Sequence, residues 1–588
     1  MPAIRNNLKS LVLRGAARYG NLVYDLTSAA RRQSMQKLSQ RRPRSFVVPP
    51  EQIEAQTALR FSPTLQHVVK ETSGQESGNQ RMNEIILQGQ EMGYFENFGE
   101  AIFINPRRID NLLELIGIPA DKKDLFLGEA KKHYLLREYV FAAQARGFFG
   151  SSFRVLDRGN YIDREYHILT RDARTLSLTR IVNQDRVKTK DQSPSVLFIP
   201  GLACNHGFYD LNNETSLALE HADQGRWVYL FDPRGLGRNK GDFDPHCFLD
   251  TLVSNDLPAT VEFIANRPTP HKPVVLIGHS MGGMVAEFML VRQAYKLNQL
   301  AQQISKMIAD PTFVTKGKTR VEITGMLEAV EARLGNERKT DHEIRALIDE
   351  ARGNLEILNA VKGLITLGSP KIFDRNEHPI YPLLLMLNIL LPIIGEDAVP
   401  VDKAKLLLKL MPRLSLALHL LINPKNFDDP KAFLTQLAEE GTDSFPLGVG
   451  LQLLKAVYSG KGVRRMGQDR FNYSAHLDEI PPDIPIFHIA APADPLAPAF
   501  NMGFIDRRYV TPGVSQLASF PEYSHTQKRV YHINQSFDPA QLPLSDASSQ
   551  VTGFLVEGVN HLDFFYGRTG ERVVRPLLNR LVDLIWQA

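Results

Sequence analysis

One short stretch, residues 272–283, places a serine between glycines where an apolar strand gives way to a helix. The strand is expected over Val274–Ile277, and the pentapeptide Gly-His-Ser-Met-Gly follows at 278–282. Small flanking residues let neighbouring backbone approach closely, so the turn can hold Ser280 in a strained conformation, with its hydroxyl above the sheet. The N-terminus of the new helix would then point at any negative charge formed there. Because a glycine-rich turn without chemistry can show the same pattern, its meaning depends on partners elsewhere in the chain.

Composition excludes some classes of protein. The chain has 588 residues, 43% hydrophobic and 23% charged, which is enough for one large α/β unit with insertions. Residues 1–45 hold ten Lys or Arg against one acidic residue, so the net charge of +4 leaves −5 for the remainder. A mildly acidic body argues against a nucleic-acid-binding enzyme. Two cysteines, Cys204 and Cys247, allow at most one disulfide and favour a reducing compartment.

The N-terminal segment combines apolar and basic residues at helical spacing. Leu8, Leu11 and Leu22 recur along it, with Arg14 and Arg18 between them. Such a helix can lie on an anionic membrane surface; a flexible basic tail is the alternative. The two arginines also interrupt the apolar core that a signal peptide needs, and no run reaches the roughly 18–20 apolar residues of a membrane span. We therefore expect a cytoplasmic protein with peripheral contact to a membrane or lipid-droplet surface.

Strands and helices alternate from about residue 156 onward. A hairpin is expected across 163–181; further strands are expected at 195–199, 227–231, 274–277, 364–367, 484–490 and 552–557, and helices at 256–264 and 571–586. This alternation predicts an α/β fold, with a mostly parallel sheet covered by helices on both faces.

The other segments suggest how the chain is divided. The expected units are a basic segment and linker (1–50), a helical N-terminal extension (51–155, with apolar spacing at 111–118 and 131–145), the core (156–290, 363–370 and 481–588), a charged helical insertion (291–362) and an apolar helical cap or lid (371–480). In the cap, two apolar stretches at 379–394 and 405–422 could cover a pocket. The alternative for them is a second small domain of ordinary buried helices.

Two later loops offer partners for Ser280. A serine nucleophile needs a base to take its proton and an acid to orient that base. Asp494 follows the strand at 484–490, and His561 follows the strand at 552–557. Parallel sheets place ligand chemistry at the carboxyl ends of their strands, so we expect these three side chains to meet. Asp563 is a second acid in the last loop, but it lies too near His561 along the chain to orient it.

Acyl transfer also requires N–H donors for the oxyanion that forms on the substrate. We expect one from the backbone of Met281 and one from Leu202, with Ala203 as second choice, in the loop after 195–199. Gly201 allows a close approach there. Gly201, Ala203 and His279 are expected to border the substrate, and His279 is assigned to the wall of the site rather than to the role of base.

With these residues, the chain resembles the α/β-hydrolase superfamily and, within it, the acid lipase group that cleaves steryl esters and triacylglycerols. The similarity lies in the hairpin 167–181, the helix 256–264, the pentapeptide 278–282 and the stretch 560–564 around the histidine. It covers residues 160–290, 364–370 and 480–588. Pro200-Gly201 stands where that family often has His-Gly.

The residues and the resemblance together predict a serine esterase or lipase that cleaves apolar carboxylic esters through an acyl-enzyme on Ser280. The expected partner is a lipid-like ester, and no metal ion or cofactor is expected. Two alternatives stay open. One is an acyltransferase that uses the same residues with an acceptor other than water, although the related polyhydroxyalkanoate synthases use a cysteine nucleophile. The other is a hydrolase fold retained for lipid binding without turnover.

Overall fold

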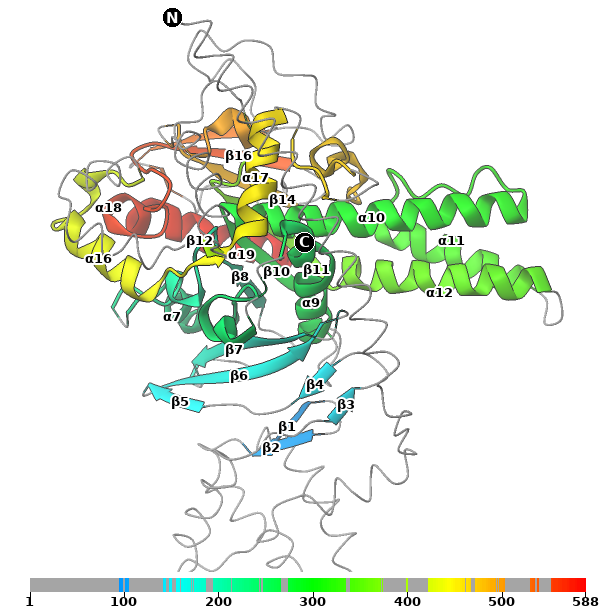
Figure 1. The fold of residues 1–588 in the computed structure, drawn as a ribbon, viewed down its shortest axis with the longest axis horizontal. Helices are drawn as coiled ribbons and strands as arrows, with labels where there is room; N and C mark the ends of the chain where they lie inside the picture. The colour runs from blue at the N-terminus through cyan, green and yellow to red at the C-terminus, as the bar shows by residue number, and fades with distance from the viewer. Residues whose placement is uncertain are drawn as a thin grey trace, which may run out of the picture.

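One large β-sheet forms the centre of the molecule (Figure 1). Apart from short gaps, the computed structural model describes residues 155–371, 421–502, 529–538 and 551–587, with short strands within 95–104, 141–150 and 398–399. In the described part of the chain this sheet has ten strands. Across the sheet they are β15 (Arg529–Ile533), β16 (Val551–Val556), β14 (Ile486–Ala490), β11 (Val361–Leu367), β10 (Val274–His279), β8 (Ser195–Ile199), β9 (Trp227–Phe231), β7 (Thr175–Asn183), β6 (Tyr161–Leu169) and β5 (Val155–Arg158).

The sheet is mostly parallel, as predicted. All neighbouring strands from β15 to β9 run parallel. The strands β7, β6 and β5 continue the sheet antiparallel, and β6 and β7 are the predicted hairpin. Strands β15 and β5 were not expected from the sequence. Both are short edge segments with charged residues and without a continuous apolar run, so neither carries the signal of a buried strand.

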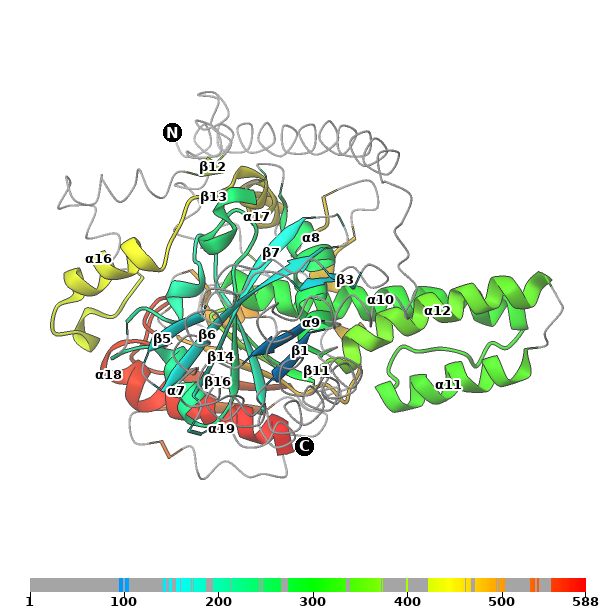
Figure 2. The same cartoon turned by 90° about the horizontal axis from the view of Figure 1, so that it is seen from below.

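Helices cover both faces of the sheet, because successive strand residues point to opposite sides. On β10, Val274 and Leu276 belong to one buried cluster, and Val275 and Ile277 belong to the other. The first cluster includes residues of α9 (Leu257–Ala265) and α10 (Met281–Ile308); the second includes residues of α7 (Leu217–Asp223) and α19 (Arg575–Gln587). Figure 2 shows the sheet between these helices.

The strand order creates a switch point in the middle of the sheet. Strand β8 lies between β9 and β10, so the chain leaves β8 toward one side and later returns to the other. Crossovers that diverge in this way leave a crevice at the carboxyl ends of the two strands, where open α/β sheets bind ligands. Gly201 and Ser280 lie just past these two strand ends.

In the N-terminal extension, the few residues that the structure describes are strands rather than the expected helices. Its described residues form β1 (Phe95–Phe98), β2 (Ala101–Ile104), β3 (Phe141–Ala143) and β4 (Phe148–Gly150), in two antiparallel pairs. The helix predicted over 131–145 is therefore wrong at its end, where strand pairing and aromatic content outweigh the helical spacing. Residues 1–94 and 111–118 lie outside the described residues.

Three helices project from the body as an arm (Figures 1 and 2). Helix α10 runs without interruption for 28 residues from the Ser280 turn, and α11 (Arg320–Arg333) and α12 (Lys339–Asn359) follow it. The boundary expected at residue 290, between the core and the charged insertion, falls inside α10. On α11 the buried residues Ile323, Leu327 and Val330 belong to the same apolar cluster as α10 and α12, which explains how the arm keeps its shape.

The described part of the cap packs on the core through α16 (Pro430–Glu440), β13 (Phe445–Pro446) and α17 (Leu447–Ser459). The expected apolar helices at 379–394 and 405–422 lie outside the described residues, apart from 421–422. Among the helices that the structure does describe, none combines the length and apolar character needed to cross a membrane.

A buried carboxylate ties the cap to the core. Asp250 accepts hydrogen bonds from Gln452 Nε2 at 2.8 Å, from the Met466 backbone N–H at 2.7 Å and from the Tyr473 hydroxyl at 2.9 Å. Burial raises the pKa of Asp250 to about 6, although these hydrogen bonds act in the opposite direction. The group therefore takes up a proton more readily in the folded protein than in the unfolded chain.

Asp250→Asn is expected to change the pH dependence of stability. Between about pH 4 and pH 6 the folded wild type binds more protons than the unfolded chain, so its free energy of unfolding falls as the pH rises through this window. The uncharged variant lacks this contribution. Urea unfolding from about pH 4 to pH 7 should show wild type losing stability relative to the variant. A difference that stays constant with pH would contradict this assignment.

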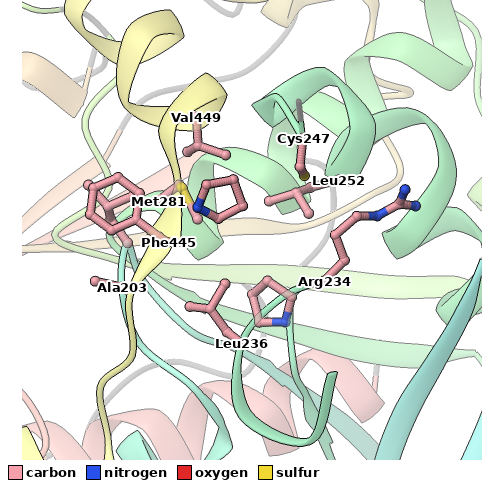
Figure 3. Close-up of a pocket in the computed structure, with 11 residues that line it drawn as sticks. Ala203, Arg234, Leu236, Cys247, Leu252, Met281, Phe445 and Val449 are labelled. Atoms are coloured by element: carbon pink, nitrogen blue, oxygen red, sulfur yellow. The ribbon is translucent and has the colours of Figure 1, made fainter. Parts of the chain in front are cut away.

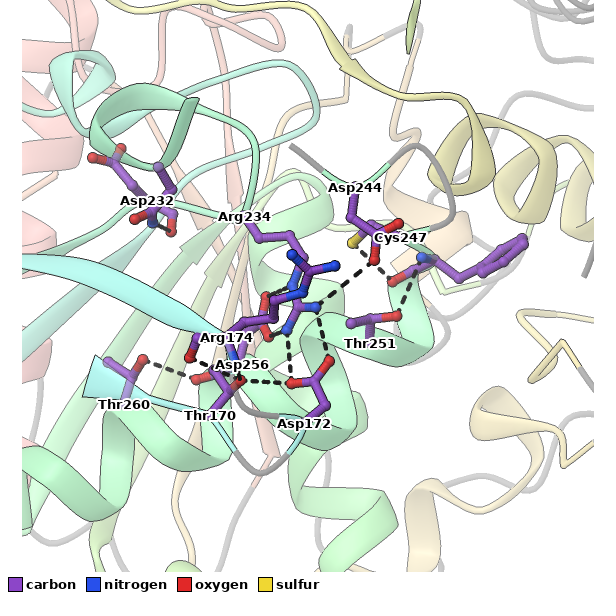
Figure 4. A network of polar contacts seen from close by, with 12 residues as sticks. Thr170, Asp172, Arg174, Asp232, Arg234, Asp244, Cys247, Thr251, Asp256 and Thr260 are labelled. Atoms are coloured by element: carbon purple, nitrogen blue, oxygen red, sulfur yellow. Dashed lines mark hydrogen bonds and ion pairs between the residues drawn. The ribbon is translucent and has the colours of Figure 1, made fainter. Parts of the chain in front are cut away.

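A second buried network surrounds Arg234 in the loop after β9 (Figure 4). Arg234 is fully buried and donates to Asp172 in the β6–β7 turn at 2.8 Å and 3.1 Å. It also donates from Nε to Asp256 Oδ2 at 3.0 Å and from Nη2 to Oδ1 of the same residue, and Asp244 lies 4.0 Å away. The network joins the hairpin, the loop after β9 and the start of α9.

Candidate active site

Ser280 occupies a tight turn between β10 and α10, as the glycine pattern predicted. Its backbone has a φ of 51° and a ψ of −123°, a region that side-chain-bearing residues rarely adopt. Its N–H donates to the Leu367 carbonyl of the neighbouring strand at 2.8 Å. A Cβ at Gly282 would lie 2.1 Å from the Ile199 carbonyl oxygen, and one at Gly283 would lie 2.0 Å from Ser369 Oγ. The turn therefore accepts only glycine at both positions.

The structure brings the three predicted residues into one hydrogen-bonded chain. Ser280 Oγ lies 2.9 Å from His561 Nε2, and His561 Nδ1 lies 2.7 Å from Asp494 Oδ2. An ionised carboxylate can only accept, so Nδ1 carries the proton and Nε2 is left to accept from the serine hydroxyl. This is the tautomer that a general base next to serine requires.

Asp494 is held in its ionised form. It is buried, and its Oδ1 accepts from the backbone N–H groups of Leu496 at 2.8 Å and Ala497 at 3.0 Å. Burial alone would raise the pKa of Asp494, but its interaction and hydrogen bond with the His561 ring and these two N–H groups outweigh it, so the pKa lies below its usual value. The carboxylate is thus charged where it faces the imidazole.

Asp563 stabilises the loop that carries His561. Its Oδ1 accepts from the Asn560 N–H at 2.7 Å, and its Oδ2 accepts from Asn426 Nδ2 at 2.5 Å and from the Asn423 N–H at 3.2 Å. Burial raises the pKa of Asp563 to about 6. All its contacts above are to the backbone or to cap asparagines, which agrees with the expectation that it does not orient the histidine ring.

His279 lies beneath the site rather than on an open wall. It is buried, its Nε2 lies 2.7 Å from the His561 carbonyl oxygen, and its ring stacks on Phe208 with centroids 4.9 Å apart. Burial and the neighbouring imidazole lower the pKa of His279 to about 3, so the neutral ring donates its Nε2–H to the carbonyl. Its Nδ1 lies toward the loop after β8, 3.2 Å from where a Cβ at Gly201 would be, and the expectation that it borders the substrate stays a prediction. Residues 275, 277 and 279 share one face of β10, and this periodicity could have placed its ring in the core.

The loop after β8 approaches Ser280 as predicted. The Cys204 N–H closes a turn on the Gly201 carbonyl at 3.1 Å, and Ala203 adopts a φ of 60°. A Cβ at Gly201 would lie 3.1 Å from Ser280 Cβ, so a larger residue would crowd Ser280. Met281 opens α10 directly after the serine.

A mostly apolar pocket adjoins this loop (Figure 3). It is small and is lined by Leu202, Ala203, Pro233, Arg234, Leu236, Cys247, Leu252, Met281, Phe445, Pro446 and Val449. The last three come from the cap, but from outside the stretches 379–394 and 405–422 that could cover a pocket by their sequence; those lie outside the described residues apart from 421–422. Leu202, Ala203 and Met281 thus lie together at one side of the pocket. Both cysteines are buried and form no disulfide.

One supporting residue was missed. Gly368, with a φ of 51°, follows β11 and lies under the hydrogen-bonded chain, since a Cβ there would be 3.2 Å from Asp494 Oδ2 and 2.9 Å from the Phe564 ring. Its signal in the sequence is the glycine directly after the strand 364–367, at the same edge of the sheet as Ser280.

Known proteins resemble parts of this chain. A model of the alpha/beta hydrolase family matches residues 196–360. Among solved structures, an esterase from Thermogutta terrifontis is 12% identical, with 72% of this chain and 97% of that chain covered and a TM-score of 0.35. A monoacylglycerol lipase from Paleococcus ferrophilus is 13% identical, with coverage of 67% and 96% and a TM-score of 0.31. A lipase in an open form is 14% identical, with coverage of 72% and 100% and a TM-score of 0.36.

A search of curated proteins finds no match to the chain. The solved structures are only loosely similar, so their activities do not transfer to this protein. The mostly parallel sheet with its central switch point, together with the family match over residues 196–360, shows that the chain has the α/β-hydrolase fold.

Proposed function

We propose that this protein is a serine hydrolase that cleaves carboxylic esters through an acyl-enzyme on Ser280. The hydrogen-bonded chain from Ser280 through His561 to Asp494 is the observation that carries the proposal. A serine, a histidine in the basic tautomer and a buried carboxylate form the arrangement that activates a hydroxyl for attack on a carbonyl.

The geometry supports the following sequence of steps. Ser280 Oγ attacks the ester carbonyl while its proton moves to His561 Nε2, and the charge of Asp494 stabilises the resulting imidazolium. The backbone N–H groups of Leu202 and Met281 are assigned to the oxyanion, which they stabilise more than they stabilise the substrate carbonyl. His561 then returns the proton to the leaving alcohol. A water molecule gives a proton to the same histidine and attacks the acyl carbonyl, and the acid is released as Ser280 Oγ takes that proton back from His561.

The substrate is proposed to be apolar. The pocket beside Leu202 and Met281 is small but has a mostly apolar lining, so an apolar part of the substrate that lies against these side chains gains free energy by leaving water. Together with the resemblance to acid lipases, this favours a lipid-like ester. The basic N-terminal segment supports contact with a membrane or lipid-droplet surface as the place where such a substrate is met.

A fluorophosphonate probe tests the nucleophile. The probe should label wild type on Ser280, as located by mass spectrometry of the labelled peptide, and Ser280→Ala should not react. Asp428→Ala is the control, because it changes an exposed side chain of the cap and passes through the same expression and purification. It should be labelled like wild type. An unlabelled wild type, or equal labelling of Ser280→Ala, would refute the proposal. A chain-length series of p-nitrophenyl esters, run beside a steryl ester and a triacylglycerol, then defines the substrate.

A further inference from the structure

The cap pairs with the loop after β8, residues 201–205, which is called the oxyanion loop below. Residues 201–205 run beside residues 441–443 as a short antiparallel pair, with a bridge between Cys204 and Thr442. The Asn205 N–H donates to the Gly441 carbonyl at 3.1 Å, and the Asp443 N–H donates to the Ala203 carbonyl at 2.8 Å. The loop that carries Leu202 is therefore held from outside the core, by a segment far away in the sequence.

The Asp443 side chain adds a second set of contacts. It is 2% exposed, and its Oδ2 accepts from Asn205 Nδ2 at 2.7 Å and from the Gly237 N–H at 2.8 Å. Its Oδ1 lies 2.5 Å from Lys240 Nζ, whose side chain is 63% exposed. One carboxylate thus connects the oxyanion loop with the turn after β9. Hydrogen bonds to an ionised acceptor are stronger than those between neutral groups, and these are shielded from water.

The loop needs such support because its backbone is strained. Ala203 has a φ of 60°, a conformation that costs free energy for a residue with a Cβ and persists only where surrounding contacts impose it. The contacts of Asp443 flank this residue, one on the Ala203 carbonyl and one on the Asn205 side chain. Without the side-chain contact, only the Asp443 N–H holds this part of the loop, which can then relax at Ala203 and turn the preceding Leu202 N–H away from Ser280.

We propose that Asp443 is a positioning residue that holds the Leu202 N–H at the place where the oxyanion develops. Because Asp443 belongs to the cap, the site is complete only when the cap is packed on the core. This rests on the proposed function of Ser280 and its partners. Asp443 touches neither the nucleophile nor the pocket in this arrangement. It acts on the transition state through the loop.

The main test compares Asp443→Ala with Asp443→Asn. An asparagine oxygen can accept from both Asn205 and Gly237, while its amide group faces the exposed Lys240, so this variant should keep most activity. Asp443→Ala should lower kcat for a p-nitrophenyl ester about 100-fold, the size expected for a misplaced oxyanion donor, with KM within about threefold. Inhibition by a trifluoromethyl ketone, which forms an oxyanion on serine, should weaken by a similar factor. Rates are expressed per active site, counted by completed fluorophosphonate labelling.

Hydrogen exchange gives a readout that does not depend on turnover. In Asp443→Ala, the amides of Cys204 and Asn205 should exchange faster than in wild type, and in Asp443→Asn they should not. Asp428→Ala is the matched control, since it removes a 90% exposed carboxylate of the same cap, and it should change neither measurement. If Asp443→Ala does not fold, Asn205→Ala removes the same hydrogen bond from the loop side and is measured in the same way.

The outcomes separate the two proposals. If wild type hydrolyses esters and Asp443→Ala does so equally well, the inference is wrong and the proposed function stands. If wild type is inactive, the proposed function fails, and hydrogen exchange alone tests the inference. Faster amide exchange at residues 204–205 in Asp443→Ala than in wild type supports the positioning role. Unchanged exchange at these residues overturns it. An equal loss of kcat in Asp443→Ala and Asp443→Asn would also overturn the inference. Asparagine keeps the hydrogen bonds to Asn205 and Gly237, so the loss could not then come from removing them.

Discussion

Asp494→Asn is expected to lower kcat for ester hydrolysis by about 10⁴-fold while leaving the fold intact. Asp494 Oδ1 already accepts from the N–H groups of Leu496 and Ala497, so an asparagine would keep its oxygen there. Its amide NH₂ would then face His561 Nδ1, where the aspartate oxygen lies at 2.7 Å in wild type. A donor in that position forces Nδ1 to accept and moves the ring proton to Nε2. The histidine could then no longer take the proton of Ser280.

The measurement is kcat on a soluble ester, with thermal unfolding of the same preparations. The contrasting variant is Asp563→Asn, because Asp563 is also buried beside His561 but bonds to the backbone and to asparagines. We expect a much smaller loss there than at Asp494. If Asp494→Asn lost less than about tenfold, the carboxylate would not control the tautomer, and the role assigned to Asp494 would have to be withdrawn.

Arg234→Met is expected to lower the free energy of unfolding by about 3–5 kcal/mol. The arginine is fully buried between Asp172 and Asp256, and Asp256 is itself 0% exposed. Methionine fills similar space but leaves a buried carboxylate without its cation, and that desolvated charge is the source of the loss. The pKa of Arg234 is raised because its ion pairs outweigh burial, so the charge is present throughout the accessible pH range.

Chemical denaturation of both proteins measures this difference, and Arg568→Ala is the control. Arg568 pairs with Asp428 at the surface, with side chains 58% and 90% exposed, so its loss should cost less than about 1 kcal/mol. An equal loss of free energy of unfolding in Arg234→Met and Arg568→Ala would show that burial of the Arg234 network adds nothing to its contribution to stability. If Arg234→Met is too unstable to purify, Asp172→Asn weakens the same network from its partly exposed side.

The core of the fold and the meeting of the three site residues could be predicted because they depend on local patterns. Apolar runs such as Val274–Ile277 form buried strands, and in a parallel sheet their carboxyl ends share one edge, which brings Ser280, Asp494 and His561 together. What could not be predicted depends on contacts between distant segments. Asp443 has no motif around it, and its role follows only from the pairing of the cap with the loop after β8.

The strand Phe141–Ala143 has a similar origin. The apolar spacing at 131–145 predicts a helix, but the conformation of these residues is decided by pairing with Phe148–Gly150, and a pairing partner leaves no mark on the spacing of one segment. For His279, strand periodicity predicts the face that it shares with Ile277, and there its ring stacks on Phe208. Pairing partners are therefore the missing information, rather than the type of residue.

The position of β16 also determines when this protein can fold. β16 is the most C-terminal of the described strands, yet it lies inside the sheet, between β14 and β15. During synthesis, β14 therefore leaves the ribosome with one hydrogen-bonding edge open, and that edge stays open until residues 551–556 follow. Unpaired strand edges are sites of aggregation, and pairing across long stretches of sequence is slow. We therefore expect nascent chains that stop before β16 to depend on chaperones, and His561, the proposed base, is added only directly after the strand that closes the sheet.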